Sequence, residues 1–182
     1  MIICLTGMPG SGKTTISEIV KEMGIPVIVM GDVVREEARI RGIEPTPKNL
    51  GKLMIEMREK MGANVIAKRC VDKIKELNSK IVLVEGVRSL EEVEEFRKVG
   101  DAKIIAVHSS PKTRYERLSR RGRSDDPKSW EEFRERDLRE LDVGIGRVIS
   151  LADEIIINEG TLEDLKENML KVFRKVIQND KS

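Results

Sequence analysis

One stretch near the start of the chain constrains its fold more than any other feature. It is Gly7-Met8-Pro9-Gly10-Ser11-Gly12-Lys13-Thr14, which fits the pattern G-x-x-x-x-G-K-[ST]. The apolar run at residues 2–5 predicts a buried parallel strand before it, and apolar residues at helical spacing predict a helix from Thr15 to Met23 after it. This order of strand, loop and helix predicts a phosphate-binding loop, and therefore binding of a nucleoside triphosphate.

The residue types of this loop suit a polyphosphate. Glycines adopt positive φ and leave room for phosphate oxygens, while successive backbone N–H groups point at the anion from the positive end of the following helix. We expect Lys13 to contact the β- and γ-phosphates and the hydroxyl of Thr14 to bind Mg²⁺. The residues expected to bind the nucleotide here are Gly7, Met8, Pro9, Gly10, Ser11, Gly12, Lys13, Thr14 and Thr15.

Length and composition set broad limits. A chain of 182 residues is of a size that forms one domain with a three-layer core. Its 34 basic residues are balanced by 32 acidic ones, so bulk charge does not favour a nucleic-acid partner. The sequence has no apolar run of membrane-spanning length and enters its first strand without a signal segment, which predicts a cytoplasmic protein. Cys4 and Cys70 fall in expected core segments and are interpreted as reduced, non-catalytic residues.

The second apolar run, at residues 26–30, predicts a short strand that ends in Gly31-Asp32-Val33-Val34-Arg35. Asp32 is the expected N-cap of the next helix, and Arg35 would lie on the same side of that helix. Ligands bind beyond the carboxyl ends of parallel strands, so both side chains are expected to face the crevice that holds the phosphate-binding loop. In the alternative interpretation Asp32 is only a cap and Arg35 only a surface charge.

Residues 43–78 form an expected helical insertion between the second and third strands. Helices are predicted at about Pro47–Lys60 and Gly62–Asn78, each with an apolar stripe. The methionines could line a substrate cleft, although filling the core is their commoner role. An insertion at this position could clasp a substrate.

The third apolar run, at residues 81–84, ends in Glu85-Gly86-Val87-Arg88. A carboxylate directly after a buried strand can reach Mg²⁺ through a water, so we expect Glu85 at a metal site; the alternative is a structural strand-end acid. Arg88 can bind a phosphate through a bidentate contact. A fourth strand is predicted at residues 102–107, and the only histidine, His108, is expected to be structural.

The densest cationic segment spans residues 114–136 and is rich in arginine, which suits phosphate recognition and stacking on adenine. Its arginines are Arg114, Arg117, Arg120, Arg121, Arg123, Arg134 and Arg136. A basic helix, a turn and a returning helix with Trp130, Phe133, Leu138 and Leu141 inward predict a lid over the triphosphate; a solvated helix face is the alternative. Aromatic residues make up only 3% of the chain, which disfavours RNA binding.

Taken together, these stretches resemble the nucleoside monophosphate kinase superfamily of P-loop kinases over essentially the whole chain. The chain looks most like an archaeal family of kinases related to dephospho-CoA kinase and adenylate kinase. Residues 31–35 resemble the adenylate kinase motif G-D-x-x-R, in which the arginine binds the acceptor phosphate. Residues 85–88 resemble D-G-[FY]-P-R, with Glu in place of Asp and without the Pro.

The cationic segment resembles the lid of adenylate kinases. Arg117-Leu118-Ser119-Arg120-Arg121 resembles R-[LI]-x-x-R, in which the first arginine lies over adenine and the second reaches phosphate. Arg123-Ser124-Asp125-Asp126 resembles R-x-D-D, and Arg134 has the spacing of the second lid arginine. Residues 152–161 resemble instead A-D-x-V-I-x-N-x-G-[ST] of dephospho-CoA kinases, which implies that Asn158 and Gly160 border adenine.

The departures from these families fall on the acceptor side. Dephospho-CoA kinases carry D-x-D after the second strand, where this chain has only Asp32. Their H-P pair and their D-x-P-L-L-F-E stretch are absent, and so is the adenylate kinase proline before Arg88. The insertion at residues 43–78 matches neither family closely.

The resemblance implies an α/β fold: a three-layer α/β/α P-loop NTPase domain with a five-stranded parallel sheet in the order 2-3-1-4-5. Its core would comprise residues 1–42, 79–110 and 150–182, with the acceptor-side insertion at about 43–78 and the lid at about 112–142.

The reaction implied is transfer of the γ-phosphoryl group of ATP, with Mg²⁺, to a small phosphate-bearing acceptor, an AMP-like nucleoside monophosphate being favoured. Two alternatives remain open: phosphorylation of a ribose hydroxyl, as in dephospho-CoA kinases, and an ATP-binding switch or RNA-associated ATPase. The expected catalytic residues are Lys13, Asp32, Arg88, Arg121, Arg123 and Arg134. Further assignments are Arg117, Asn158 and Gly160 to the nucleotide, Asp32, Arg35 and Arg88 to the acceptor, and Thr14 and Glu85 to the metal.

Overall fold

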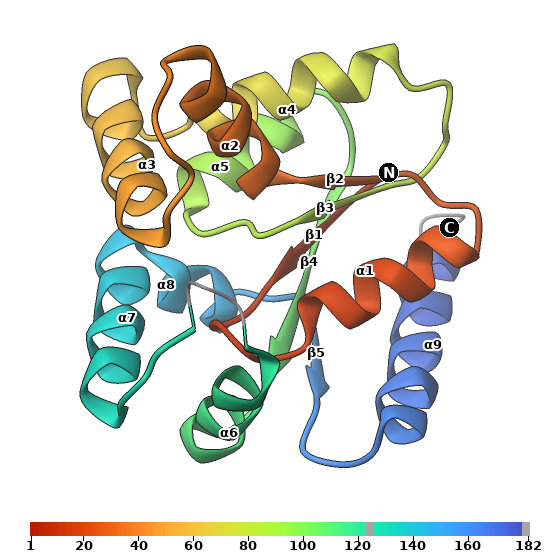
Figure 1. Cartoon of the computed structure of the whole chain (residues 1–182). Coiled ribbons are helices and arrows are strands. Elements are labelled where there is room, and N and C mark those ends of the chain that lie inside the picture. Colours follow the sequence, from red (N-terminus) through yellow and green to blue (C-terminus); the bar gives the residue numbers. More distant parts are fainter. Residues whose placement is uncertain (123–125, 180–182) are drawn as a thin grey trace.

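The computed structural model describes residues 1–122 and 126–179, and Figure 1 shows its fold. Strands and helices alternate along the chain. They are β1 (Ile2–Thr6), α1 (Lys13–Glu22), β2 (Val27–Val29), α2 (Met30–Ile40), α3 (Pro47–Met61), α4 (Val65–Glu76), β3 (Val82–Glu85), α5 (Leu90–Arg97), β4 (Ala102–His108), α6 (Pro111–Arg121), α7 (Trp130–Val143), α8 (Ile145–Ser150), β5 (Glu154–Ile157) and α9 (Leu162–Asn179).

The strands of the described residues form one parallel sheet in the order β2-β3-β1-β4-β5, which confirms the order expected from the sequence. The first strand is central: Cys4 pairs with Val84 of β3 on one side and with Ile104 of β4 on the other. The phosphate-binding loop follows β1 and therefore leaves the middle of the sheet, flanked by the carboxyl ends of β3 and β4.

Alternate residues of the strands face opposite helix layers, which is why the strands are apolar nearly throughout. On one face, Cys4 and Ile104 pack in a cluster with residues of α2, α3, α4, α5 and α8. On the other face, Leu5 and Ile105 pack with residues of α1 and α9. Figure 1 shows the sheet between these two layers, which confirms the three-layer α/β/α fold.

The start of α2 corrects one expectation. Asp32 is not the N-cap of this helix, because the helix begins at Met30 and Val29 occupies the cap position. The side chain of Met30 is buried in the core, and the helix begins three residues earlier than an N-cap at Asp32 would place it. Asp32 instead lies in the first helical turn, where a carboxylate interacts favourably with the helix dipole.

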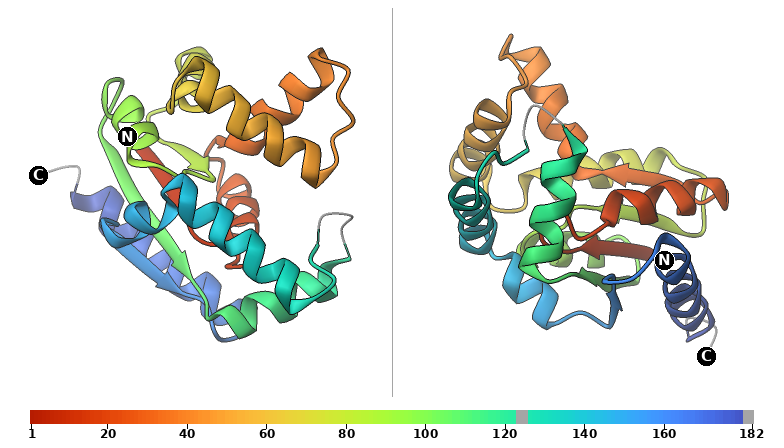
Figure 2. Two further views of the ribbon diagram at one scale, coloured as in Figure 1. Left: turned by 90° about the vertical axis from the view of Figure 1, so that its left-hand side faces the viewer. Right: turned by 60° about the horizontal axis from the view of Figure 1, so that its bottom comes forward.

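The region expected as an insertion, residues 43–78, contains two helices with different surroundings. Helix α4 buries Ile66 and Cys70 completely. Both residues pack in the same core cluster as strand residues such as Val84, so α4 belongs to the core layer. Helix α3 contributes Leu53 and Met57 to the same core cluster. Figure 2 shows α2 and α3 as one arm and α6 and α7 as another, both extending from the edge of the sheet where the strands end.

Helix α7 packs less deeply than expected. We expected Trp130, Phe133, Leu138 and Leu141 to point inward, but only Phe133 is buried among the residues of α7, all of which are described. Trp130, Leu138 and Leu141 are 39%, 54% and 46% exposed. Apolar burial therefore does little to fix the orientation of this helix. None of the helices seen in the described residues is both long and apolar enough to cross a membrane.

Candidate active site

The phosphate-binding loop has a backbone that only glycine accommodates at key positions. Gly7, Gly10 and Gly12 have φ of 148°, 81° and 105°. A Cβ on Gly10 would lie 2.8 Å from the carbonyl oxygen of Arg114, and one on Gly12 would lie 2.3 Å from Nδ2 of Asn158. The loop is thus held in a tight curve by its neighbours, a backbone form that suits the binding of an anion by N–H groups.

Lys13 lies folded against this loop. Its Nζ donates hydrogen bonds to the carbonyl oxygens of Gly7, at 2.5 Å, and Met8, at 3.1 Å. Burial lowers the pKa of Lys13 from its ordinary value of 10.5 to about 8, although the nearby carboxylate of Glu85 opposes this shift. A polyphosphate would relieve the cost of burying the ammonium group, because it supplies the opposite charge.

Thr14 and Glu85 form the candidate metal site. The hydroxyl of Thr14, at the start of α1, lies 3.2 Å from Oε1 of Glu85, the buried last residue of β3. Hydroxyl and carboxylate oxygens suit Mg²⁺. Within residues 1–122 and 126–179 no three His, Cys, Asp or Glu side chains gather as a metal cage. The pair therefore fits an ion that takes its remaining ligands from phosphate and water.

A cavity of about 350 Å³ opens over the loop. This is a size typical of ligand pockets. It is lined by Gly7, Pro9, Gly10, Gly12, Lys13, Thr14, Thr15, Glu18, Glu85, Gly86, Arg88, Arg117, Leu118, Arg121, Arg136, Glu140 and Ile145. Five of these side chains are cationic and three are acidic. The excess of positive charge suits a polyphosphate.

Arg88 lies where both arms meet the core. Its Nε is 2.7 Å from Oε2 of Glu140 on α7, and its Nη1 is 3.4 Å from the sulfur of Met54 on α3. Its backbone N–H donates to the buried carboxylate of Glu92 on α5, at 2.8 Å, and Glu92 also pairs with Arg58 of α3. The guanidinium expected to bind a phosphate thus already has an acidic partner in this structure.

The residues expected beside adenine divide into two groups. Arg117 lines the cavity and donates to Oγ of Ser109, at 2.9 Å, and to Oδ1 of Asn158, at 3.3 Å. Asn158 lies behind the loop, where its Nδ2 donates to the carbonyl oxygen of Ser11 at 2.8 Å. Neither Asn158 nor Gly160 lines the cavity. Asn158 acts from this position as a support of the loop.

The lid arginines also divide. Arg121 lines the cavity and donates to the carboxylate of Asp126. Arg134 does not line it: this side chain borders a separate hollow with Trp130 and Leu138, and Arg136 takes the expected place at the cavity. Two residues correspond to about 200° around a helix, so Arg134 and Arg136 cannot share a face. Arg123, expected to be catalytic, lies outside the described residues, as do Ser124 and Asp125.

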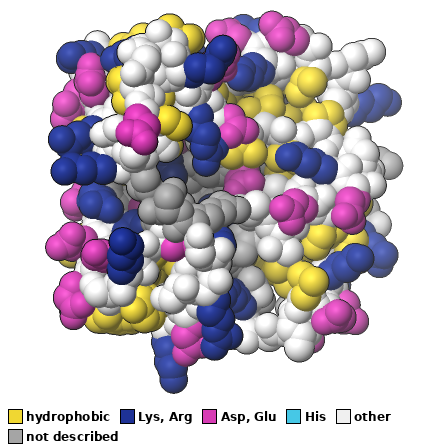
Figure 3. Space-filling model, in the orientation of Figure 1, with side chains coloured by type: hydrophobic (Ala, Val, Ile, Leu, Met, Phe, Trp, Pro, Cys, Tyr) yellow, Lys and Arg dark blue, Asp and Glu magenta, His cyan; other side chains and the backbone are white. Residues whose placement is uncertain are grey.

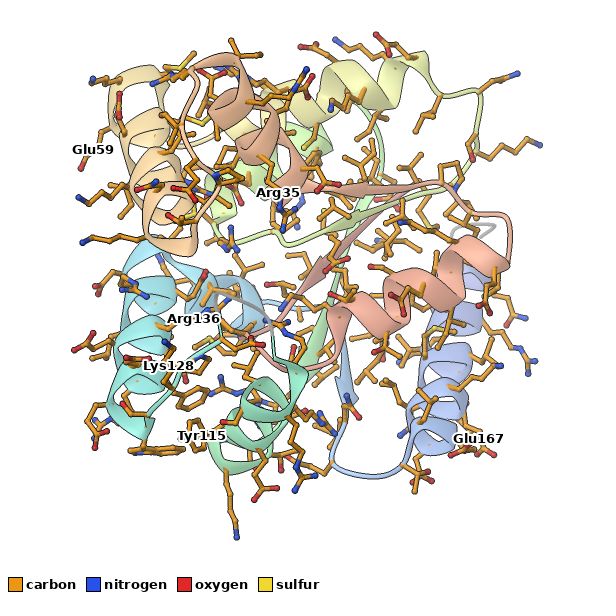
Figure 4. All side chains as sticks on the ribbon, in the orientation of Figure 1. Arg35, Glu59, Tyr115, Lys128, Arg136 and Glu167 are labelled. Carbon is orange, nitrogen blue, oxygen red and sulfur yellow. The ribbon has the colours of Figure 1, made fainter. Side chains whose placement is uncertain are left out.

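Asp32 and Arg35 stay outside the cavity lining. Nη1 of Arg35 lies 2.5 Å from Oδ1 of Asp32, and the two side chains are 54% and 61% exposed. They belong to the first turns of α2, at the carboxyl end of β2. Figure 4 labels Arg35 and Arg136, which come from opposite arms of the molecule.

Several residues that shape the site were not singled out from the sequence: Arg114 and Arg136 were named only among the arginines of the expected lid, and Asp137 and Glu140 were not named. Arg114 is buried and forms a bidentate pair with Asp137, at 2.8 and 2.5 Å, while Arg136 and Glu140 line the cavity. The signal was helical spacing: residues three, four or seven positions after buried Phe133 on α7 share its side of the helix. Those positions are 136, 137 and 140.

The two cysteines and the histidine are not favoured as catalytic residues. Burial raises the pKa of the Cys4 and Cys70 thiols to about 12, so neither is an effective nucleophile near neutral pH. His108 is exposed at the end of β4 and does not line the cavity.

Comparison with known proteins finds relatives over nearly the whole chain. A family profile described as "AAA domain" matches residues 6–134. A UPF0200 protein of Hyperthermus butylicus is 54% identical over 176 residues, which cover 97% of this chain and 95% of that protein. A UPF0200 protein of Pyrococcus abyssi is 50% identical over 182 residues, covering 97% of each chain.

Solved structures of small-molecule kinases share the fold. Shikimate kinase from Bacteroides thetaiotaomicron has a TM-score of 0.67 and 18% identity, with 97% of this chain and 98% of that chain covered. Deoxyadenosine kinase from M. mycoides has a TM-score of 0.55 and 18% identity, with 98% and 100% covered. At this identity the likeness concerns the fold alone. The expected kinship with an archaeal family of P-loop proteins is confirmed: this chain belongs to the UPF0200 family.

Proposed function

We propose that this protein is an ATP-dependent small-molecule kinase that transfers the γ-phosphoryl group to a nucleotide-type acceptor, with an AMP-like nucleoside monophosphate favoured. One observation carries the proposal. The phosphate-binding loop, the Thr14–Glu85 oxygen pair and arginines from α6, α7 and the segment after β3 converge on one cavity. A site built only for nucleotide binding does not need cations from α6, α7 and the end of β3 around the same phosphates.

The residues around the phosphoryl donor, ATP, would have separate roles. The loop N–H groups and Lys13 would hold the β- and γ-phosphates, and Arg117 would lie against the base. Thr14 and Glu85 would hold Mg²⁺, which neutralises charge on phosphate oxygens when bound. Arg121 and Arg136 would stabilise negative charge on the migrating group, a role we transfer from Arg134 to Arg136. Replacing Lys13 by Ala is expected to cost at least about 10²-fold in rate, the scale of losing one transition-state donor.

The acceptor side is assigned to Arg88, Arg35 and Asp32. Arg88 borders the cavity from the end of β3 and can place an acceptor phosphate opposite the γ-phosphate. Arg35 and Asp32 lie at the end of β2, the neighbouring strand, so they would meet the part of the acceptor that extends beyond the cavity. Asp32 would orient the acceptor oxygen and acts as a base only if that oxygen belongs to a hydroxyl.

A second candidate is phosphorylation of a hydroxyl group, as in dephospho-CoA kinases. The ion pairs of the acceptor side favour it: Arg88 is paired with Glu140, and Arg35 with Asp32. An acceptor phosphate would meet those carboxylates and their negative charge, whereas a hydroxyl would not. A nucleotide-dependent switch or RNA-associated ATPase is the third candidate, and it predicts tight nucleotide binding without acceptor turnover.

The test is ADP release from Mg-ATP in the presence of AMP, CMP, UMP, GMP, dephospho-CoA or deoxyadenosine, each tested alone, with Lys13→Ala as the blank. Strong stimulation by one nucleoside monophosphate supports the first candidate. Stimulation only by dephospho-CoA or deoxyadenosine moves the conclusion to a hydroxyl acceptor. Tight nucleotide binding without stimulation by any compound contradicts both kinase candidates and favours the switch.

A further inference from the structure

The orientation of α7 needs an explanation, because it decides which side chains reach the cavity. This helix of 14 residues buries Phe133 alone, and its larger apolar residues are partly exposed. Apolar packing therefore leaves its rotation about its own axis poorly determined. Yet Arg136 and Glu140 line the cavity, while Arg134 does not.

Two ion pairs restrain α7. Arg88 holds Glu140. Arg114 of α6 holds Asp137 and also contacts the phosphate-binding loop. Its guanidinium is buried and forms a bidentate contact with the carboxylate of Asp137 on α7, at 2.8 and 2.5 Å. The same group lies over the ring of Phe133, 4.9 Å from its centroid. A bidentate contact between a planar guanidinium and a carboxylate fixes the angle between the two groups as well as the distance between them. Asp137 directly follows Arg136 on α7. Fixing Asp137 therefore fixes the rotation of the helix and the direction in which Arg136 extends from it.

Arg114 also touches the phosphate-binding loop. Its Nη1 donates to the carbonyl oxygen of Pro9 at 3.1 Å, and its Nε donates to that of Ser109, after β4, at 3.2 Å. The first turn of α6 presses against Gly10: a Cβ there would lie 2.8 Å from the carbonyl oxygen of Arg114. A shift of the loop backbone around a phosphate therefore acts on this side chain directly.

We propose that Arg114 is a positioning residue: it transmits the conformation of the phosphate-binding loop through Asp137 to α7 and so places Arg136 over the phosphates. The inference rests on the proposed function only insofar as the loop binds a nucleoside triphosphate. It does not depend on the acceptor. Arg114 itself touches the loop and not the reacting atoms.

The chain contains its own reporter. Trp130 is its only tryptophan and begins α7. Its ring packs at 5.3 Å from that of Tyr115, the residue after Arg114, and at 5.0 Å from that of Phe133. Figure 4 shows Tyr115 on α6, between that helix and α7. Trp130 emission will therefore change if α7 moves against α6.

The experiment compares Trp130 emission with calorimetric binding of Mg-ADP in the wild-type protein, Arg114→Lys and Asp137→Asn. Arg114→Lys keeps the charge and loses the fork, while Asp137→Asn keeps the shape and loses the charge. Arg120→Lys, at an exposed position of the same helix, is the matched control. Thermal melts verify that each variant is folded, and Asp137→Asn serves alone if Arg114→Lys unfolds.

In the wild type and the control, nucleotide is expected to change the emission. In both test variants the dissociation constant for Mg-ADP should stay within about threefold of the wild-type value. The emission change on binding should fall to less than about a third of the wild-type change. With the acceptor that the enzyme phosphorylates, kcat should fall by about tenfold or more at unchanged KM. A full emission change in folded Arg114→Lys and Asp137→Asn would overturn the relay, as would nucleotide binding to the wild type without any change. An intact relay with no acceptor phosphorylated would instead count against the kinase function.

Discussion

At the scale of single residues, Lys13 carries a charge whose cost depends on the ligand. Burial strips its ammonium group of water, which lowers its pKa to about 8, even though the carbonyl oxygens of Gly7 and Met8 accept hydrogen bonds from it. Nearby arginines also disfavour its charge, and Glu85 favours it. A bound triphosphate adds several negative charges next to it, so binding must raise this pKa again.

The affinity for nucleotide should therefore depend on pH. Below pH 8 the free protein already carries the charged lysine, and binding needs no proton. Between pH 8 and the ordinary lysine value of 10.5, binding must take up a proton, so affinity falls with rising pH by up to about tenfold per unit. Calorimetry of Mg-ADP binding at pH 8.5–9.5 in buffers of different ionisation enthalpy measures this uptake. Equal uptake by Lys13→Met would assign the proton to another group.

The buried carboxylate of Glu92 connects α3 to the segment that carries Arg88. Its side chain is fully buried, it accepts the backbone N–H of Arg88, and it pairs with Arg58 of α3 at 2.5 Å. It thereby ties the loop that carries Arg88 to the arm formed by α2 and α3.

Replacing Glu92 by Gln should lower the free energy of unfolding by about 3–5 kcal/mol, because the substitution leaves Arg58 as a buried charge without its partner. Urea unfolding measures the loss. Glu94→Gln is the matched control: Glu94 lies on the same helix, is 62% exposed and pairs only with solvent-exposed Arg97 among the interactions found here. Equal stability of the two variants would show that Arg58 finds another partner.

At the scale of elements, α7 is a helix oriented by ion pairs. Arg114–Asp137 joins it to α6, and Arg88–Glu140 joins it to the end of β3. Both pairs are partly or largely shielded from water, so their geometry is more restrictive than that of surface pairs. The second pair places a carboxylate beside the arginine assigned to the acceptor.

Glu140→Gln separates the acceptor classes at this element. If the acceptor brings a phosphate to Arg88, removing the carboxylate should lower the KM for that acceptor by roughly three- to tenfold, equivalent to about 1 kcal/mol of relieved repulsion. Steady-state kinetics with saturating Mg-ATP measures it, and Glu135→Gln, an exposed position of α7, is the control. An unchanged KM would favour a hydroxyl acceptor, and a higher KM would mean that Glu140 itself binds the acceptor.

At the scale of the whole molecule, basic and acidic residues nearly balance. The chain has a net charge of +2 from 34 basic and 32 acidic residues. On the face shown in Figure 3, basic and acidic side chains lie interspersed over all elements in view. An excess of positive charge is found instead around the cavity, which five cationic and three acidic side chains line.

We therefore expect weak binding to single-stranded RNA. Fluorescence anisotropy with a labelled mixed-sequence oligonucleotide of about 20 nucleotides at about 150 mM salt should give a dissociation constant above about 10 μM. Submicromolar binding that weakens steeply with salt would refute this expectation and revive the RNA-associated ATPase.

The sequence predicted most of the fold and part of the site, for identifiable reasons. The loop at residues 7–14 and the strand order were predictable because they follow from local patterns and from a resemblance over the whole chain. The Thr14–Glu85 pair was expected because Thr14 follows the loop after β1 and Glu85 ends β3, the strand next to β1. Motif spacing pointed to Arg134, whereas Arg136 lines the cavity, because motif spacing does not specify how a weakly buried helix is rotated.

What the sequence determined by itself was local: a loop of glycines, a lysine and a threonine, set between a strand and a helix, together with the residue types that suit phosphate. What only the tertiary structure decided was which distant groups meet there. Asn158 supports Ser11 across 147 positions of the chain, and Arg114 reaches Pro9 across 105. Such contacts depend on packing between segments far apart in sequence, and short-range periodicity carries no information about them.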